Sequence, residues 1–184
     1  MTLYDPMHFE RQADNYARAR PPYPAALWDR LGELGLLTPG SRALDLEAGT
    51  GQATGPLRAA GLEVVAVEPG SQLAQRLRDQ HPGVEVIESR AEEVELEPTA
   101  YDLAVVATAI HWMDTDLLAP KVHRALQSDG RLAVWRNIFG DPEAPVTPFR
   151  QRVQEILAQT ERPPRPGAGD PEHYRSWLLV LRPR

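Results

Sequence analysis

The sequence has no cysteine among its 184 residues. Disulfide bonds, thiolate metal sites and a cysteine nucleophile are therefore excluded. Long apolar runs are also missing, because no segment approaches the roughly 18–20 residues that a membrane-spanning helix needs. The amino-terminal residues carry no basic segment followed by an apolar core, so we expect no secretory signal. From these absences we expect a cytoplasmic protein with no membrane partner.

Positive charge is in deficit, with 20 lysines and arginines against 26 aspartates and glutamates and a net charge of −6. This balance argues against a nucleic-acid-binding surface as the main function. The hydrophobic content of 42% and the charged content of 25% are typical of a globular protein. The chain is long enough for one well-buried domain and too short for two ordinary ones. We therefore expect a single domain over residues 1–184.

Short apolar segments alternate with helical patterns through the middle of the chain. The predicted strands cover 42–46, 63–67, 84–87, 101–107 and 131–135. The predicted helices between them cover 52–60, 71–81 and 116–126, and Ser128-Asp129-Gly130 is a predicted turn. Strands separated by helices of about a dozen residues indicate parallel βαβ units with right-handed crossovers. This pattern predicts an α/β fold.

The segments on either side of this core are less regular. Two helices are predicted over 7–18 and about 25–36, and the prolines of 20–24 force an extended segment between them. After the fifth strand we expect a helix over 149–159 and a linker over 162–169. The tail from Trp177 holds one short apolar segment and no returning hairpin. We divide the chain into an amino-terminal helical segment over 1–37, a core over 38–137, and an incomplete carboxy-terminal region over 138–184.

A glycine turn follows the first strand, in Asp45-Leu46-Glu47-Ala48-Gly49-Thr50-Gly51. Such a turn presents backbone N–H groups and the positive end of a helix dipole to a ligand. Glycine is expected because a Cβ would block a positive φ or the approach of the ligand. A dinucleotide site would want glycine or alanine at Thr54 and would not call for Asp45. The turn therefore favours S-adenosylmethionine over a dinucleotide.

Polar residues also follow the second and third strands. Glu68, followed by Pro69, can accept hydrogen bonds from both hydroxyls of a ribose, although a solvated strand-end acid is the alternative. Ala91 and Glu92 can lie beside an adenine edge, or Glu92 can be one more solvated acid in an acidic loop. Asp45 is expected to point toward an ammonium group, with pairing to Arg42 or another local base as the alternative.

Three further groups complete the predicted site. Thr108 lies at the ligand-facing end of the fourth strand, and His111 can take a proton from a nucleophile there or serve a structural role. Trp112 is expected to form a wall of the site. Tyr16 and Arg20 precede the proline segment, and an arginine there can hold a carboxylate or be a surface charge.

These segments together resemble the class I S-adenosylmethionine-dependent methyltransferases, in particular the type 11-like small-molecule group. The similarity covers about 9–137 and is carried by 14–24, 44–51, Glu68, 91–92, 101–114 and 122–132. It implies a doubly wound, Rossmann-like, mostly parallel sheet in the order 3-2-1-4-5, with amino-terminal helices that cover the cofactor. It also implies methyl transfer from S-adenosylmethionine to an O, N or C nucleophile of a small molecule.

If methyl transfer uses a base, His111 is the predicted one, and no metal is expected. The predicted cofactor-binding residues are Tyr16, Arg20, Asp45, Glu47, Ala48, Gly49, Gly51, Glu68, Pro69, Ala91, Glu92 and Thr108.

Two features depart from the family pattern. Glu47 stands where the family usually has the first glycine of its motif, beside the methionine end of the cofactor. The carboxy-terminal antiparallel hairpin is missing from the predicted elements, which would expose the edge of the fifth strand to a second copy of the chain. An impaired or inactive cofactor-binding or scaffold protein of the same fold is therefore the alternative function. A NAD(P)-dependent oxidoreductase is a less favoured one.

Overall fold

The structure is a computed structural model that describes residues 22–139, 151–152 and 174–182. Its contacts divide the chain into two compact units, one of 1–135 with 178–184 and one of 136–177. The candidate site and the packed sheet belong to the first unit. In the second unit, the described residues are 136–139, 151–152 and 174–177.

Several predicted elements lie outside the described residues. These are the helix over 7–18, the linker over 162–169, and all but 151–152 of the helix over 149–159.

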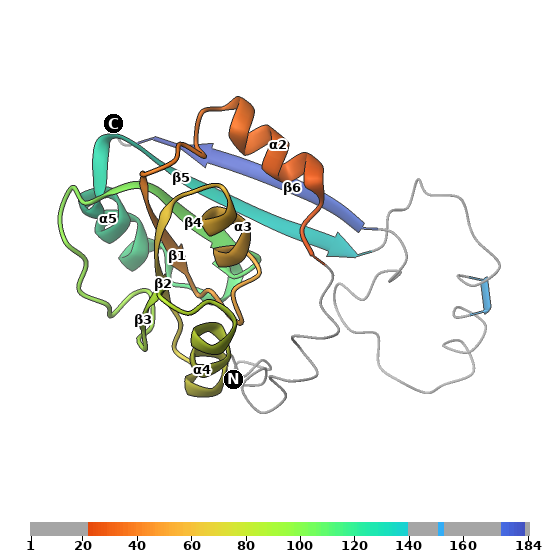
Figure 1. The fold of residues 1–184 in the computed structure, drawn as a ribbon, viewed down its shortest axis with the longest axis horizontal. Coiled ribbons are helices and arrows are strands. Elements are labelled where there is room, and N and C mark those ends of the chain that lie inside the picture. Colours follow the sequence, from red (N-terminus) through yellow and green to blue (C-terminus); the bar gives the residue numbers. More distant parts are fainter. Residues whose placement is uncertain (1–21, 140–150, 153–173, 183–184) are drawn as a thin grey trace. The chain divides into compact units, whose positions relative to one another are not determined.

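The core is a six-stranded sheet flanked by helices (Figure 1). The strands are β1 (Arg42–Leu46), β2 (Glu63–Val67), β3 (Glu85–Ile87), β4 (Tyr101–Ala107), β5 (Leu126–Phe139) and β6 (Tyr174–Leu181). The helices are α2 (Ala25–Glu33), α3 (Thr54–Ala59), α4 (Ser71–Gln80), α5 (Thr115–Ala125) and the short 3₁₀ helix η3 (Ile110–Trp112). The strand order is β3-β2-β1-β4-β5-β6, and the first five strands pair in parallel. The predicted order 3-2-1-4-5 is confirmed.

The sheet continues one strand further than the sequence indicates. β6 is the neighbour of β5 and runs antiparallel to it (Figure 1). Leu178 and Val180 pack against the apolar cluster that contains Trp135, whereas the intervening Leu179 is exposed. The expectation of no returning hairpin is therefore corrected, because Tyr174–Leu181 forms one antiparallel strand beside β5, with side chains that alternate between the cluster and solvent. The described edge of the sheet lies at β6 rather than at β5.

The predicted turn at Ser128-Asp129-Gly130 is an irregular part of β5. Tyr101 of β4 pairs with Leu126 of β5, and Leu103 pairs with Arg131. A step of two residues on β4 thus faces a step of five on β5, and the extra residues bulge where the turn was expected. β5 therefore begins before the turn and resumes its regular register after it.

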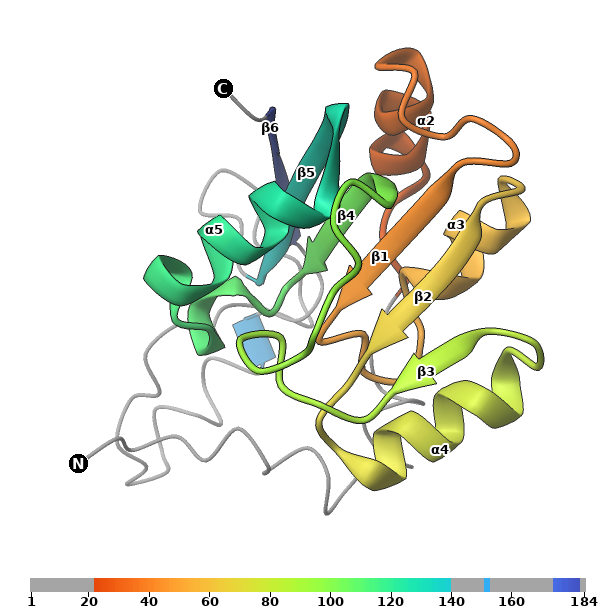
Figure 2. The same ribbon diagram turned by 90° about the vertical axis from the view of Figure 1, so that its left-hand side faces the viewer.

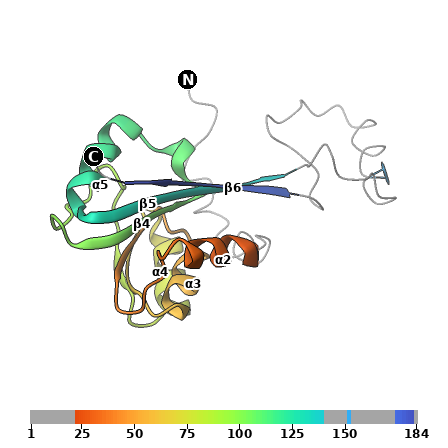
Figure 3. The same cartoon turned by 90° about the horizontal axis from the view of Figure 1, so that it is seen from above.

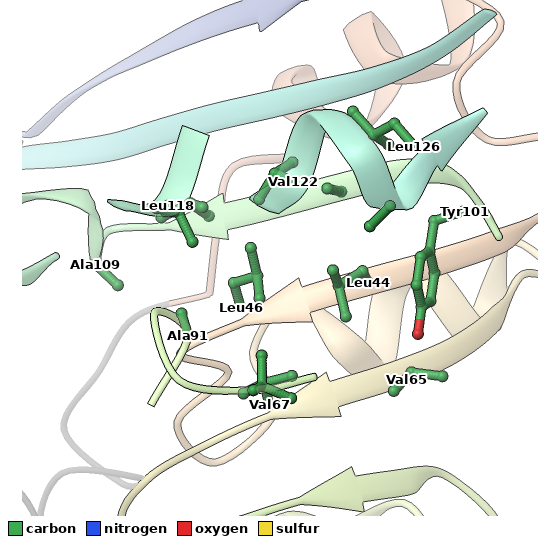
Figure 4. Packing of buried hydrophobic residues seen from close by; sticks show 14 of the residues in the cluster. Leu44, Leu46, Val65, Val67, Ala91, Tyr101, Ala109, Leu118, Val122 and Leu126 are labelled. Atoms are coloured by element: carbon green, nitrogen blue, oxygen red, sulfur yellow. The ribbon is translucent and has the colours of Figure 1, made fainter. Parts of the chain in front are cut away.

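Helices cover both faces of the sheet. Figure 3 shows α5 on one face and α2, α3 and α4 on the other. Leu44 and Leu46 of β1 pack with α5 on the first face, in the cluster drawn in Figure 4. Because side chains alternate along a strand, Ala43 and Asp45 face α3 on the other side. The doubly wound arrangement therefore places an acid inside the layer between β1 and α3.

The carboxyl ends of the parallel strands meet at one edge of the sheet. Figure 2 shows the arrowheads of β1, β2 and β4 at this edge, and the turn after β1 lies beside them. In an open α/β sheet, ligands bind outside these ends, near the point where the strand order reverses. In this order the reversal lies between β1 and β4. The fold therefore directs the search for a site to the residues that follow β1, β2, β3 and β4.

Tyr23 joins the segment before α2 to the end of β4. Its hydroxyl lies 3.0 Å from Thr108 Oγ1, and its ring packs edge-on against Trp135. We expect Tyr23→Phe to lower the free energy of unfolding by about 1 kcal/mol, because one part-buried hydrogen bond is lost. Urea denaturation measures the change. Tyr101→Phe is the control, because that hydroxyl bonds to none of the described residues; equal losses in both variants would contradict the expectation.

Candidate binding site at the strand ends

The turn after β1 has a left-handed backbone at three positions. The φ angles are +55° at Glu47, +61° at Gly49 and +92° at Gly51. The Ala48 N–H donates to the Val67 carbonyl at 3.0 Å, which fastens the turn to β2. Glycine adopts such angles without strain, so the two glycines have the conformation that the sequence predicts. Glu47 adopts it at a cost of roughly 1–2 kcal/mol, because its Cβ crowds the backbone.

His81, the residue that follows α4, lies directly against the glycines of this turn. A Cβ on Gly51 would lie 2.6 Å from His81 Cδ2, and a Cβ on Gly55 would lie 2.9 Å from His81 Cε1. Glycine at these positions therefore makes room for an imidazole, in addition to permitting the turn. Burial, followed by the charge of Arg58, lowers the pKa of His81, although a hydrogen bond with the Gly51 backbone opposes them. The ring is therefore neutral at pH 7.

Sequence reasoning missed His81. The available signal was weak, since it consists only of a histidine at the end of a helix and an extra glycine four residues after Gly51.

Asp45 is fully buried, and its partner is Thr54 at the start of α3. Thr54 Oγ1 donates to Asp45 Oδ2 at 2.6 Å, and Asp45 Oδ1 has no hydrogen-bond partner among the described residues. Burial raises the pKa of Asp45 to about 7, although the bonds from Thr54 oppose the shift. Arg42, the local base that we considered as a partner, pairs with Glu97 instead. Asp45 therefore links β1 to α3.

Glu68 directly follows β2 and is almost entirely buried, at 4% exposure. Its Oε2 accepts the Gly49 N–H at 2.7 Å, and its Oε1 accepts the Gly70 N–H at 2.8 Å. The carboxylate thus joins the glycine turn to the start of α4. This burial is inconsistent with a merely solvated strand-end acid. Pro69, next in the chain, is half-buried.

Glu47 reaches across to the loop after β3. Its Oε1 accepts the Ala91 N–H at 3.1 Å, although the two residues are 44 positions apart. Burial raises the pKa of Glu47 to about 7, and the charges of Glu68 and Glu92 add to the rise. The bond from Ala91 and the charge of Arg90 oppose it. These contacts define a strand-end cluster made of Glu47, Gly49, Glu68, Ala91 and Glu92.

Glu92 holds its own loop in place. Its side chain is 6% exposed, and its Oε1 accepts the N–H of Asp114, the residue that caps α5. Its Oε2 is buried without a hydrogen-bond partner in the described part of the chain. Lys121 of α5 donates to the carbonyls of Glu92 and Val94 at 2.6 and 2.7 Å. The side chain is therefore not simply solvated, and its Oε2 can still accept a hydrogen bond.

The end of β4 carries the remaining described candidates. Thr108 has a φ of +63°, and its N–H donates to the Trp135 carbonyl at 2.8 Å. His111 is exposed in η3, and its ring centroid lies 4.6 Å from that of Trp112. Tyr16 and Arg20 lie outside the described residues. The structure thus brings together the candidates that follow β1, β2 and β3, and it places His111 on the helix that follows β4.

The chemistry offered by the strand-end cluster is mainly that of acceptors and negative charge. Three carboxylates meet backbone N–H groups at the point where a parallel sheet ordinarily binds a ligand. Groups of three or more potential metal ligands do not occur among the described residues. The same residues contain no helix long and apolar enough to cross a membrane. The arrangement suits a ligand that has hydroxyl donors and positive charge.

Comparison with known proteins agrees with this geometry. Residues 44–134 match the family described as a methyltransferase domain. An uncharacterized methyltransferase of Mycobacterium tuberculosis is 40% identical over 121 residues, which make up 65% of this chain and 48% of that protein. A probable S-adenosylmethionine-dependent methyltransferase of Saccharomyces cerevisiae is 29% identical over 143 residues, or 73% of this chain and 47% of that protein. The chain spans about half the length of these curated relatives.

Solved structures share the fold. A protein of Anaeromyxobacter dehalogenans, provisionally described as a type II methyltransferase, is 33% identical with a TM-score of 0.61, over 79% of this chain and 61% of that one. An N-methyltransferase of Haemonchus contortus, solved with S-adenosylhomocysteine, has a TM-score of 0.61 over 84% of this chain and 38% of that one. The second is 21% identical, so its likeness shows the fold alone.

Proposed function

We propose that the chain, whose residues 44–134 match the methyltransferase-domain family, binds S-adenosylmethionine at the strand-end cluster. We propose further that it transfers the methyl group to an O, N or C nucleophile of a small molecule. The observation that carries the proposal is the position of Glu68. This buried acid directly follows β2 and is fastened to the glycine turn through the Gly49 N–H.

The residues present fit this cofactor in all but one respect. A buried carboxylate at the end of β2 can accept hydrogen bonds from ribose hydroxyls, and the Ala91 N–H can donate to an adenine nitrogen. The negative charge of the cluster suits a sulfonium and an ammonium group. The exception is Glu47, whose carboxylate already accepts the Ala91 N–H. Binding through that N–H therefore requires the Glu47 side chain to turn away.

The bound cofactor would supply an activated methyl group, and the protein would then contribute mainly position. Methyl transfer from a sulfonium is a displacement, in which holding the two reactants in line can supply most of the rate enhancement. Where the acceptor must lose a proton, we assign His111 as the base, since it is exposed on η3 directly after β4. Thr108 is held at the end of the same strand by its bond to Tyr23 and is assigned to the cofactor side.

Four finer proposals accompany this function. Tyr16 and Arg20 would hold the carboxylate of the cofactor, as part of an amino-terminal cover over 1–37. Residues 38–137 would form the cofactor-binding core, which a carboxy-terminal region over 138–184 follows. The protein would act in the cytoplasm. A homodimer would form through the exposed edge of the sheet, which is β6 in the described residues.

A second function, that of an impaired or inactive cofactor-binding or scaffold protein of the same fold, is favoured by one observation. Glu47 has a backbone conformation suited to glycine and bonds to an N–H that the cofactor would use. In that case the wild-type chain would bind S-adenosylhomocysteine much more weakly than Glu47→Gly does and would show no methyl transfer.

Calorimetric titration with S-adenosylhomocysteine tests the proposed function. We expect one site per chain, and we expect Glu68→Gln to weaken binding by about tenfold, because a charge-assisted hydrogen bond is worth roughly 1.5–3 kcal/mol. Glu63→Gln is the matched control, because Glu63 is exposed at the opposite end of β2. Absence of binding at millimolar ligand by the folded wild type would contradict the proposal, as would stabilisation by NADPH and not by S-adenosylhomocysteine.

A further inference from the structure

Glu47 brings a third carboxylate to a place that already holds Glu68 and Glu92. We propose that Glu47 is a specificity-determining residue, whose charge makes the site prefer the positively charged S-adenosylmethionine over its neutral product, S-adenosylhomocysteine. This inference rests on the proposed function and concerns the same site. It gives a role to a side chain that occupies a position suited to glycine, at φ +55°.

The surroundings of Glu47 are acidic on several sides. Glu68 approaches from the end of β2, and Glu92 approaches from the loop after β3. Arg90, on the same loop, is the opposing cation, but its Nη2 lies 3.6 Å from Glu92 Oε1 and its side chain is 46% exposed. Lys121 directs its Nζ to the carbonyls of Glu92 and Val94. The cluster therefore keeps an excess of negative charge wherever Glu47 is ionised.

Burial also strengthens the electrostatic effect that the ionised Glu47 carboxylate has on a ligand. Glu47 is half-buried, and its backbone is fixed in the turn that follows β1, so the carboxylate stays close to the strand ends after it releases the Ala91 N–H to the ligand. A charge in such a place acts on a ligand through a lower effective dielectric constant than water provides. Burial raises the pKa of Glu47 to about 7. The group is therefore neutral well below pH 7 and ionised above it.

The two ligands differ in a way that isolates this charge. They share the adenosine and amino-acid parts, and they differ by one methyl group and the positive charge that it confers on sulfur. Displacing Glu47 from the Ala91 N–H costs the same for both ligands, because both present the same adenine. The ratio of the two affinities therefore reports the electrostatic effect of Glu47, and the absolute affinities report its steric effect.

The test is calorimetric titration of both ligands into the wild-type chain, Glu47→Gln and Glu63→Gln. Glutamine keeps the size of Glu47 and removes its charge, and Glu63→Gln removes the same charge from the opposite end of β2. At pH 8 we expect the preference for S-adenosylmethionine to fall about tenfold in Glu47→Gln, as for one charge at close range in a partly buried site. We expect Glu63→Gln to keep the wild-type preference.

The pH dependence supplies an independent readout. The wild-type preference for S-adenosylmethionine should decline from pH 8 to pH 6 as Glu47 takes up a proton. Titration of the ligands themselves is common to the wild type and Glu47→Gln, so it cancels when the two are compared at each pH. The difference between the two proteins should therefore be large at pH 8 and small at pH 6.

Three outcomes would overturn the proposal, and they differ from one another. An unchanged preference in Glu47→Gln at pH 8 would show that the charge does not discriminate. Binding of both ligands by Glu47→Gly alone would show that Glu47 only blocks the site, while the proposed cofactor would stand. Failure of every variant to bind either ligand, with folding verified by circular dichroism, would remove the proposed function and this inference with it.

Discussion

Asp45→Asn is expected to stabilise the fold at pH 8 and to weaken the dependence of stability on pH. Burial raises the pKa of this carboxyl from 3.8 to about 7. Folding therefore favours the protonated form of Asp45. The stability of a fold with a neutral carboxyl here is fully present below about pH 4 and is lost as the pH rises through 7. At about 1.4 kcal/mol for each pKa unit, ionisation costs the fold up to roughly 4 kcal/mol at pH 8.

Asparagine removes this cost and keeps an oxygen that can accept the Thr54 hydroxyl. Its amide N–H₂ would replace Asp45 Oδ1, which has no hydrogen-bond partner among the described residues, so the amide would also lack one. We therefore expect a net gain of about 1–3 kcal/mol at pH 8, smaller than the full cost because one buried polar group stays unpaired. The gain should shrink toward pH 5.

Urea denaturation at pH 5, 6.5 and 8 measures the effect. Asp129→Asn makes the same chemical change at an exposed position and should leave stability within about 0.5 kcal/mol at each pH. Some pH dependence should persist in Asp45→Asn, because the pKa of Glu47 is also raised to about 7. A variant that is less stable than the wild type at pH 8 would contradict the placement of an unpaired carboxyl between β1 and α3.

Gly51→Ala, in contrast to Asp45→Asn, is expected to destabilise the fold. Its φ of +92° is strained for alanine, and the new Cβ would lie 2.6 Å from His81 Cδ2. Strain from the angle costs roughly 1–2 kcal/mol, and the forced displacement of a packed side chain typically adds about 1–3 kcal/mol. We therefore expect a loss of about 3 kcal/mol in the free energy of unfolding.

Two further variants separate these effects. Gly83→Ala has a similar angle, φ +87°, with nothing within 4 Å of the new Cβ, so it should show the cost of the angle alone. His81→Ala removes the ring that the Cβ meets, so the double variant Gly51→Ala with His81→Ala should recover the steric part. We expect a coupling of about 1–2 kcal/mol in this double-mutant cycle. Equal losses in Gly51→Ala and Gly83→Ala, with no coupling, would show that His81 does not constrain the turn.

The parallel part of the sheet could be predicted because its signals are local. Val64 to Val67 form an apolar run between two glutamates, Glu63 and Glu68, and the run is long enough for a strand buried on both faces. β6 was not predicted, because Trp177 to Leu181 is an unbroken apolar run that lacks the alternating pattern of a half-exposed strand. The turn signal of Ser128-Asp129-Gly130 was real, but pairing with β4 on both sides of it incorporated these residues into β5.

The candidate site shows the same division between local and non-local signals. The position of Glu68 follows from the strand that precedes it, and the structure buries this acid beside the turn. The bond of Asp45 to Thr54 and the bond of Glu47 to Ala91 join residues 9 and 44 positions apart. No pattern along the chain encodes these contacts, because they depend on how β1, α3 and the loop after β3 pack. Glu47 was identified as unusual from the sequence, but its partner was not.

A crystal structure of the chain with S-adenosylhomocysteine tests the central claim most directly. The account predicts the ligand outside the carboxyl ends of β1 and β2, with ribose hydroxyls within hydrogen-bonding distance of Glu68 and the Ala91 N–H released from Glu47. A ligand bound elsewhere on the chain, or bound here without contact to Glu68, would contradict the assignment of the strand-end cluster as the cofactor site.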